Sequence, residues 1–367
     1  MFDQTKPQLF FFGANTPKGF VSLFDQLDPQ NGPWHTFIIK GGPGTGKSSF
    51  LKKIAAHFAP QCPQIEVVPC SSDPNSLDAV ILPEYRVALA DGTAPHTLEP
   101  SAPALRQSIL SFGDYLNAPR LKENREELEA LFAASPKCYR LAVDYFSAAY
   151  AFLADTRRIA LSATSMEKVA AYAQRFAQKN FGRSKEEHPT EKVRFLTAVH
   201  AGGLTALEDT PKQLCRRLYQ IHDEFGAVSP LLLGALRSCA LEAGHSVITC
   251  YCPTDPYHKI EHLFLPNLGI GFVTVNRFHP MESLAPCHRI HAKRFMDMEL
   301  LRSRKGRLSF NRKAAQQLIA QTVNLLKESR IIHDKLESRY TAAMDFSFFE
   351  DAFQQVAEQI NTYAKLF

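Results

Sequence analysis

The sequence lacks the features that mark several large classes of protein. It has only eight cysteines in 367 residues and no paired C-x-x-C motif, so a disulfide scaffold is excluded and we expect reduced thiols. No stretch approaches 18 consecutive apolar residues, the length that a membrane-spanning helix needs. The charge excess is also small, with 42 Lys and Arg against 37 Asp and Glu. Net charge therefore gives no general argument for binding nucleic acid or a membrane surface.

The start of the sequence, Met1 to Pro7, has no basic region followed by a long apolar run and a small-residue cleavage site. We therefore expect a cytoplasmic protein with no membrane contact. The composition, 45% hydrophobic and 22% charged, is ordinary for a globular chain, and the length predicts about two domains.

An internal repeat divides the chain near its middle. Cys70-Ser71-Ser72-Asp73-Pro74 recurs 182 residues later as Cys252-Pro253-Thr254-Asp255-Pro256. Loop insertions shift such an offset by a few residues, and we expect the duplication to join residues 1–184 to residues 185–367. Further matches are Pro83 and His96 with Pro266 and His279 at an offset of 183, and Asp144, Tyr150 and Asp155 with Asp334, Tyr340 and Asp345 at an offset of 190.

Each half predicts an α/β core with a parallel sheet, followed by a long helical hairpin. The expected cores are residues 1–100 and 192–285, the helical parts are residues 101–181 and 290–367, and the polar segment Gly182 to Pro189 is the expected linker. The expected strands of the first core are His35 to Lys40, Ile65 to Cys70 and Tyr85 to Ala90. The expected helices are Leu121 to Ala133, Cys138 to Ala160, Met166 to Lys179, Asn311 to Ala342 and Phe348 to Leu366.

A phosphate-binding loop follows the first of these strands. Gly41-Gly42-Pro43-Gly44-Thr45-Gly46-Lys47-Ser48 matches G-x-x-x-x-G-K-[ST], and a helix with an apolar stripe leaves it, so residues from Gly41 to Ser49 are the candidate nucleotide site. Backbone N–H groups of such a loop hold β- and γ-phosphate oxygens. Lys47 adds a positive charge, for which we expect exposure at the loop mouth, and the Ser48 hydroxyl can ligate Mg²⁺. An ordinary glycine-rich turn is the alternative.

Magnesium also needs a carboxylate at the end of a neighbouring strand. Asp91 is the best candidate, since it closes the run Val87 to Ala90, although an Asp-Gly pair is also a common turn. Asp73 and Asp78 could orient water or an acceptor hydroxyl, but Asp73-Pro74-Asn75-Ser76 reads more readily as a turn. Lys47, Asp91, Asp73 and Asp78 are therefore the candidate catalytic residues, and Glu84 and His96 are weaker ones.

The chain resembles an uncharacterised family of bacterial tandem-domain P-loop ATPases, the P-loop containing nucleoside triphosphate hydrolases. The resemblance covers essentially the whole chain. It rests on the tandem halves and on the stretches GGPGTGKSS, CSSDPNSLDAVILPE and ADGTAPH. It implies two P-loop NTPase-like domains that bind ATP, commonly with a phosphate loop in each half.

The second half departs from that pattern. At the offset of 182 the loop becomes Asp223-Glu224-Phe225-Gly226-Ala227-Val228-Ser229-Pro230, so the lysine is replaced by Ser229 and the serine by Pro230. The two acidic residues put negative charge where a polyphosphate would bind, while Leu232, Leu233 and Leu236 keep the apolar stripe of the following helix. We therefore predict a degenerate domain and one nucleotide per chain.

Two other patterns in the second half have competing interpretations. Cys250, Cys252, His258 and His262 could hold a metal, but their spacing is not a standard zinc pattern, and a catalytic cysteine has as little support. Residues 289–313 contain nine Lys or Arg. A solvated helical face is favoured there over a nucleic-acid contact or an arginine that completes the phosphate site of the first half.

The leading hypothesis is a Mg²⁺-dependent ATPase with a single active site in the first half. ATP rather than GTP is the default, since no clear guanine-reading motif is present. One alternative is a kinase for a small molecule, although no acceptor signature is visible. The other is a nucleotide-gated interaction module without hydrolysis, which would bind a protein partner through its helical hairpins.

Overall fold

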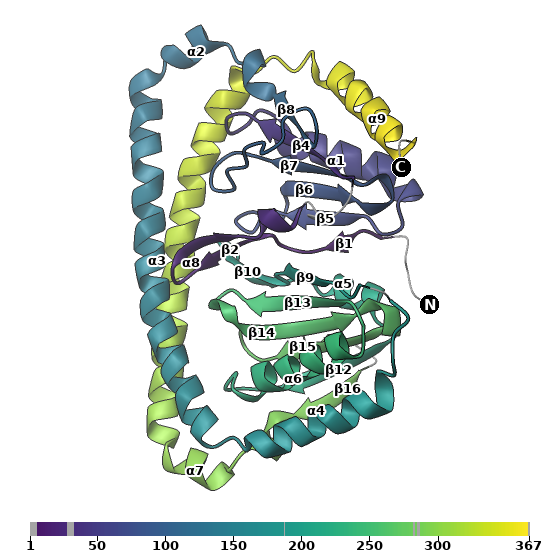
Figure 1. Cartoon of the computed structure of the whole chain (residues 1–367). Coiled ribbons are helices and arrows are strands. Elements are labelled where there is room, and N and C mark those ends of the chain that lie inside the picture. Colours follow the sequence, from purple (N-terminus) through teal and green to yellow (C-terminus); the bar gives the residue numbers. More distant parts are fainter. Residues whose placement is uncertain (1–5, 28–32, 187, 282, 285–286, 366–367) are drawn as a thin grey trace. The chain divides into compact units, whose positions relative to one another are not determined.

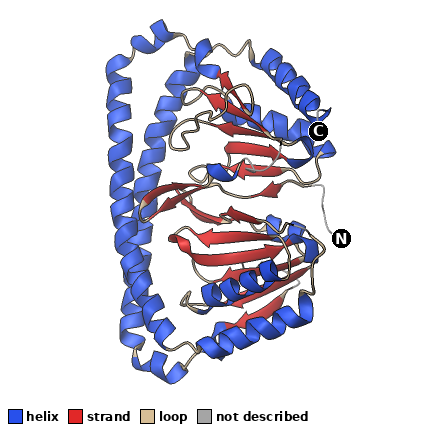
Figure 2. Ribbon diagram, in the orientation of Figure 1, coloured by secondary structure: helices blue, strands red, loops and turns tan. Residues whose placement is uncertain are grey.

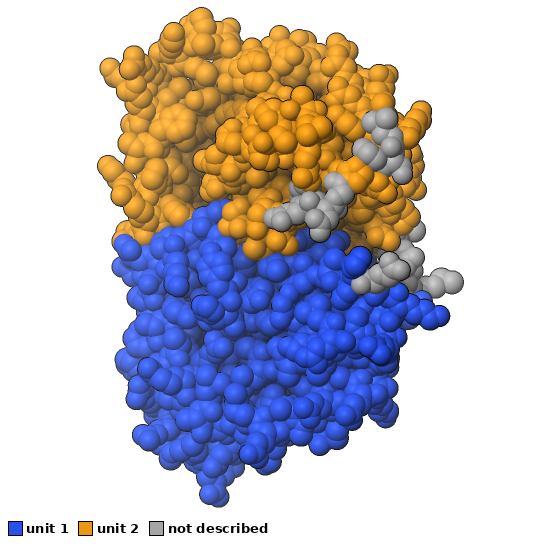
Figure 3. Space-filling view, viewed as in Figure 1, with its two compact units in different colours: residues 1–2, 15–21, 143–323 blue, residues 3–14, 22–142, 324–367 orange. Residues whose placement is uncertain are grey.

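The computed structural model describes residues 6–27, 33–186, 188–281, 283–284 and 287–365. The expected chain start at Met1–Thr5, position 187 of the expected linker and the last expected helical residue, Leu366, lie outside the described residues. Two compact units are present (Figure 3). One unit contains residues 3–14, 22–142 and 324–367, and the other contains residues 1–2, 15–21 and 143–323. Whether each half of the sequence is a domain in its own right stays a prediction.

The first core is a six-stranded mixed sheet with the order β1-β5-β6-β7-β4-β8 (Figures 1 and 2). The expected strands are confirmed to within a few residues, but the expected all-parallel sheet is wrong. β6 was not expected, and it runs antiparallel to both β5 and β7. The strands are β1 (Gln8–Leu9), β4 (His35–Lys40), β5 (Glu66–Pro69), β6 (Leu77–Leu82), β7 (Val87–Asp91) and β8 (Gln107–Ser111).

The missed strand has a simple physical origin. Residues 70–76 form a tight turn, in which Cys70 N donates to Ser76 O over 2.9 Å, so the chain returns beside β5 as a hairpin. A crossover to a parallel neighbour would need a dozen or more residues, and this turn is too short for one. The turn motif Asp73-Pro74-Asn75-Ser76 is therefore the sequence feature that could have predicted the antiparallel strand β6.

Helices α1 (Lys47–Phe58) and α9 (Phe349–Lys365) pack on this sheet through one apolar cluster. On α1 the residues at helical spacing, Phe50, Leu51 and Ile54, are fully buried. α9 comes from the far end of the sequence, and its buried Phe353 and Ile360 join the same cluster. The first core is therefore completed by the C-terminal helix of the chain.

The second core repeats this arrangement with the order β16-β12-β15-β14-β13-β9. α4 (Met166–Asn180) and α6 (Val228–Glu242) pack together in its apolar cluster, so a helix from the first half of the sequence completes the second core. The strands are β9 (Glu191–Arg194), β12 (Arg217–His222), β13 (Val247–Cys252), β14 (Asp255–Leu265), β15 (Ile270–Val275) and β16 (His288–His291).

Strand register supports the duplication. Ala79 pairs with Ala90 across β6 and β7, and 183 residues later His262 pairs with Val273 across β14 and β15. In the helical parts, however, the expected offset of 190 is wrong. α3 (Arg125–Ser162) and α8 (Lys305–Ala342) begin and end 180 residues apart, so the spacing shared by Asp144 and Asp334 is a coincidence.

The expected helical hairpins are also wrong, because α4 and α9 leave the long helices and pack on sheets. The two helices expected between Leu121 and Ala160 are mainly one, since α3 continues through Pro136. In each unit α3 and α8 instead contact each other, through Glu127 and Arg339 in one and Asp155 and Arg307 in the other.

Shorter elements are β2 (Gly13–Thr16), β3 (Gly19–Ser22), α2 (Ala118–Lys122), β10 (Thr197–His200), β11 (Gly203–Ala206), α5 (Asp209–Leu214) and α7 (Met298–Ser303). Among the described helices, none combines the length and the apolar character needed to span a membrane.

Candidate phosphate site

The candidate phosphate loop connects β4 to α1 at the edge of the sheet where β4 and β7 end. α1 begins at Lys47, and its N-cap is Gly46. Gly44 and Gly46 have φ angles of 69° and 86°, in the left-handed region that only glycine adopts without strain. The loop therefore needs glycine at these two positions. Gly46 is a fixed glycine of the motif, whereas Gly44 stands at one of its variable positions.

Lys47 is buried, with a relative exposure of 9%, so its expected exposure at the loop mouth is wrong. Its Nζ donates to the carbonyl oxygens of Gly41 over 3.1 Å and Gly42 over 2.7 Å. Asp91 Oδ2 lies 3.7 Å from the same nitrogen. The structure thus brings the lysine and the proposed magnesium carboxylate together, and the ammonium charge faces the inside of the loop.

Asp91 is the last residue of β7, and β7 is the parallel neighbour of β4. Its Oδ1 accepts hydrogen bonds from the backbone N–H and the hydroxyl of Thr93, at 2.9 and 2.5 Å, which fixes the carboxylate. Burial raises the pKa of Asp91, and the charge of Lys47 together with the bonds from Thr93 opposes that rise. Oδ2 remains directed to the lysine side of the loop.

Ser48 lies in the first turn of α1, and its hydroxyl oxygen accepts a hydrogen bond from the N–H of Leu77 over 2.9 Å. The hydroxyl thus connects the phosphate loop to the start of β6. Serine and aspartate oxygens are ligands that suit Mg²⁺. The residues that could hold a magnesium ion here are Ser48 and Asp91.

The end of α8 covers the loop within the same unit. The Thr341 hydroxyl donates to Gly44 O over 3.1 Å. A methyl group at Gly42 would lie 2.7 Å from the Tyr340 ring, and one at Gly44 would collide with Glu337 O and the Thr341 hydroxyl. Sequence reasoning missed these contacts, because nothing in residues 337–341 resembles a nucleotide motif.

Asp73 serves the turn between β5 and β6. Its carboxylate accepts from the Ser76 hydroxyl over 2.9 Å and from Asn75 N over 3.3 Å, and Arg330 of α8 pairs with it at 2.8 Å. Burial raises the pKa of Asp73, but the bonds from Ser76 and Arg330 outweigh burial and lower it overall. These contacts favour the interpretation that Asp73 stabilises a turn over the interpretation that it orients a water molecule.

Asp78 lies in a second cluster beside the loop. His96 Nε2 is 3.0 Å from Asp78 Oδ2, and both side chains are buried. Cys70 completes a group in which one ligand atom from each residue lies within 4.8 Å of the others. Asp78 therefore lies beside an imidazole and a thiol. The sequence alone indicated His96 only as a weak candidate.

The corresponding loop of the second half holds a carboxylate of its own. Asp223 is fully buried. Its Oδ2 accepts from Val228 N, Ser229 N and the Ser229 hydroxyl at 2.8 to 3.0 Å, and its Oδ1 accepts from Gly226 N over 3.1 Å. Burial raises the pKa of Asp223, while the bonds from Ser229 and the charge of Lys259 lower it. These N–H groups correspond to those of Gly44, Gly46 and Lys47, so Asp223 occupies the anion position.

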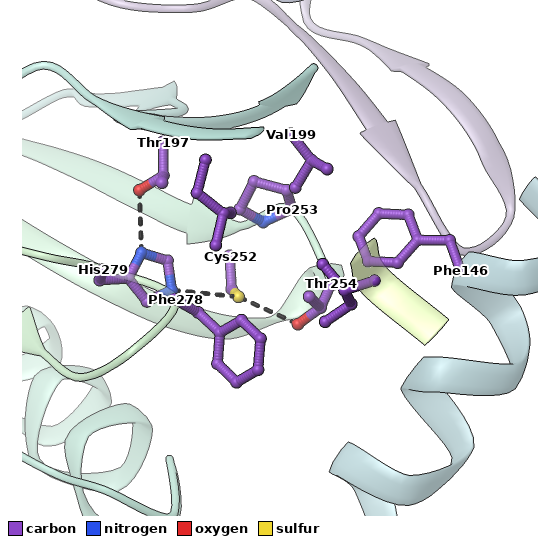
Figure 4. A pocket seen from close by; sticks show the side chains of 10 residues that line it. Phe146, Thr197, Val199, Cys252, Pro253, Thr254, Phe278 and His279 are labelled. Atoms are coloured by element: carbon purple, nitrogen blue, oxygen red, sulfur yellow. Dashed lines mark hydrogen bonds between the residues drawn. The ribbon is translucent and has the colours of Figure 1, made fainter. Parts of the chain in front are cut away.

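The sequence pattern of Cys250, Cys252, His258 and His262, whose spacing disfavours a metal site, does not form one group in the structure. The structure places Cys252 with Glu261 and His279, the counterparts of Cys70, Asp78 and His96. Figure 4 shows Cys252 Sγ between the Thr254 hydroxyl, at 3.0 Å, and His279 Nε2, at 3.4 Å. Burial raises the pKa of Cys252, although Lys259 lowers it. A raised pKa disfavours a catalytic thiolate at this position.

The basic segment 289–313 includes β16, α7 and the start of α8. Arg307 donates to Asp155 of α3, and Arg294 lies over the Tyr172 ring at 5.1 Å. Two of its cations therefore hold neighbouring elements in place. Arg330, which pairs with Asp73, lies outside this segment.

Comparison with known proteins identifies no relative. No protein-family model, no curated protein and no solved structure matches this chain. The geometry of the site is therefore the basis for assigning a function to this chain.

Proposed function

We propose that this protein binds ATP with Mg²⁺ at residues Gly41–Ser49 and hydrolyses the γ-phosphate there. The observation that carries the proposal is the meeting of Lys47 and Asp91 at a glycine-rich turn between a strand and a helix, with 3.7 Å between the ammonium and the carboxylate. Such a turn offers converging N–H groups to an anion, and the helix N-terminus adds positive potential.

Each side chain has a separate task in this proposal. Lys47 holds the triphosphate oxygens by charge and gives up part of its bonding to Gly41 O and Gly42 O as it does so. Ser48 and Asp91 would hold the magnesium ion, which neutralises phosphate charge when bound. Thr93 keeps the Asp91 carboxylate in place.

Only the first half is expected to bind nucleotide. In the second half the loop N–H groups already donate to Asp223, and neither a loop lysine nor a loop hydroxyl corresponding to Ser48 is present. Binding there would require breaking these bonds and placing a polyphosphate against a buried carboxylate. We therefore expect one nucleotide per chain.

A nucleotide-gated interaction module is the second candidate, and the contact between α8 and the loop favours it. Thr341 and Tyr340 lie against Gly44 and Gly42. A ligand that reshapes the loop would therefore move the end of α8. Gating and hydrolysis are compatible, but a protein that only gates would bind ATP and release no phosphate.

Titration and phosphate release test the proposal together. Isothermal titration with a non-hydrolysable ATP analogue and Mg²⁺ should give a stoichiometry near one, and phosphate release should depend on Mg²⁺. Lys47→Ala should weaken binding by about 10- to 100-fold, because it removes charge-assisted hydrogen bonds of about 1.5–3 kcal/mol. Ser229→Ala, at the matching position of the second half, should leave nucleotide affinity unchanged.

Each contrary result has a definite meaning. Unchanged affinity in Lys47→Ala would overturn the site, and two equivalent nucleotides per chain would overturn the assignment of the second half. Binding without phosphate release would favour the gating function, and phosphate release only with an added acceptor would favour a kinase.

A further inference from the structure

The cluster of Cys70, Asp78 and His96 has no role in the proposed nucleotide chemistry. It combines a thiol, a carboxylate and an imidazole, and one ligand atom of each lies within 4.8 Å of the others. Asp78 and His96 have relative exposures of only 5%. Cys70 is partly buried, so the three groups lie largely out of solvent beside the candidate phosphate loop.

The separations suit a tetrahedral metal ion. Zinc binds thiolate sulfur at about 2.3 Å and imidazole or carboxylate atoms at about 2.0–2.2 Å, which places ligand atoms about 3.4–3.6 Å from one another. The distance from His96 Nε2 to Asp78 Oδ2 is 3.0 Å, and all separations lie under 4.8 Å. Small side-chain shifts therefore suffice to form three bonds to one ion.

Local structure fixes these ligands independently of a metal. Cys70 begins the turn that Asp73 stabilises, and Asp78 is the second residue of β6, which follows that turn. The His96 ring stacks on Phe24 with 4.4 Å between ring centres. Lys40 holds the loop that carries His96 by donating to the carbonyl oxygens of Gly92 and Leu98.

The second half shows the same triad with a cation built into it. Lys259 Nζ lies 2.9 Å from Glu261 Oε2 and 3.7 Å from Cys252 Sγ. Burial lowers the pKa of Lys259, but its acidic neighbours, Glu261 and Asp223 among them, outweigh burial and raise the pKa overall. The residue two positions before Asp78 in the first half is the neutral Ser76.

We propose that Cys70, Asp78 and His96 bind one Zn²⁺ ion, and that Lys259 takes the place of this ion in the second half. A thiolate with an imidazole favours zinc over magnesium, which prefers oxygen ligands, so the site is distinct from the magnesium site at Ser48 and Asp91. Three protein ligands leave a fourth position for water or another ligand. The ion joins the β5–β6 turn to the loop that follows Asp91.

Cobalt substitution tests this assignment on the full chain. The chain is stripped with a chelator, desalted and titrated with Co²⁺, which reports a thiolate ligand through a near-ultraviolet charge-transfer band. We expect one equivalent to produce the band and Zn²⁺ to displace it. Cys70→Ser should abolish the band and weaken zinc binding by about 100-fold or more, because a direct ligand is worth at least as much as a supporting one. His96→Gln should weaken zinc binding in the same direction.

Matched cysteine variants supply the controls. Cys252→Ser, in the triad that contains Lys259, and Cys138→Ser, on α3, should both keep the cobalt band. Loss of the band in Cys252→Ser but not in Cys70→Ser would overturn the proposal. Circular dichroism establishes that each variant is folded.

X-ray absorption of the zinc-loaded wild-type chain decides the question without any variant. We expect a shell of one sulfur and several nitrogen or oxygen atoms. A shell without sulfur, or the absence of stoichiometric zinc binding, would overturn the site. Neither measurement uses nucleotide, so failure here is distinguishable from failure of the proposed ATPase.

Discussion

The two corresponding loops, Gly41–Ser48 and Asp223–Pro230, differ in what accepts hydrogen bonds from their backbone N–H groups. In the second half the Asp223 carboxylate accepts from Gly226 N, Val228 N and Ser229 N. In the first half the corresponding position is Gly41, which has no side chain. The backbone conformation of such a loop can thus be stabilised by an internal carboxylate in place of a bound anion.

The two halves share the residues that pack the core but differ in the polar residues of the loop. The helices after the two loops keep buried apolar residues at matching positions, Phe50, Leu51 and Ile54 in α1 and Leu232, Leu233 and Leu236 in α6. Lys47 and Asp91 have become Ser229 and Thr274. Residues that fill the core are needed for folding with or without a ligand. Under the proposed function, the lysine and the carboxylate are needed only for binding phosphate and metal.

The largest effect should come from removing the internal anion. Asp223→Ala leaves the N–H groups of the second loop buried without their acceptor, and Lys259 loses a nearby negative charge. Breaking such a buried arrangement typically costs about 3–5 kcal/mol. Denaturant unfolding should show a loss of this order, while Ser229→Ala should lose only about 1 kcal/mol. Equal stability of Asp223→Ala and the wild type would contradict the anion role.

The converse substitution should convert the first loop into the second. Gly41→Asp places a carboxylate at the position that corresponds to Asp223. The new Cβ would lie 2.6 Å from the Thr45 hydroxyl and 3.3 Å from the Cβ atoms of Thr45 and Phe112, so the loop must shift by a few tenths of an ångström to accept it. We expect at least a roughly thousandfold loss of nucleotide affinity, because the N–H groups become occupied and the polyphosphate is repelled. Titration calorimetry measures the loss, and Gly41→Ala controls for the added volume.

A smaller effect should follow from changing the magnesium carboxylate. Asp91→Asn keeps the shape of the side chain and removes its charge beside Lys47. We expect Mg²⁺-dependent phosphate release to fall by about 10-fold or more, and metal-free nucleotide binding to change much less. Hydrolysis at the wild-type rate would show that a carboxylate other than Asp91 holds the metal.

The smallest effect should come from the ion pairs between the long helices and the β-turns. Arg330→Ala removes the partner of Asp73, and Arg157→Ala removes the partner of Asp255 in the other unit, where the pair is 3.1 Å long. Each pair lies near the surface, so each loss should be about 1 kcal/mol or less.

The pH dependence of these losses gives a sharper test. The pKa of Asp73 is lowered in the folded state, so its contribution is present above the pKa of the unfolded chain and disappears as pH falls through the folded pKa. Unfolding experiments from neutral to acid pH should therefore show the difference between the wild type and Arg330→Ala shrinking at low pH. A constant difference would mean that Asp73 does not depend on Arg330.

Local sequence signals by themselves determined much of the first core. The loop is marked by glycines, which permit positive φ angles, and the strand before it and the apolar stripe of α1 are marked by side-chain spacing. Both signals are visible in the sequence. The repeat around Cys70 and Cys252 likewise predicted two similar cores. The loss of Lys47 and Ser48 in the second copy was visible from an alignment of the chain with itself.

The tertiary structure alone decided which distant segments meet. α9 completes the first core and α4 the second, because the continuous helices α3 and α8 carry the chain away from the sheet it has just formed. Tyr340 and Thr341 reach the phosphate loop for the same reason. The role of Asp223 also depends on the tertiary structure. The sequence showed only a negative charge at this position, and the hydrogen bonds that make it an internal anion come from N–H groups that the fold brings together.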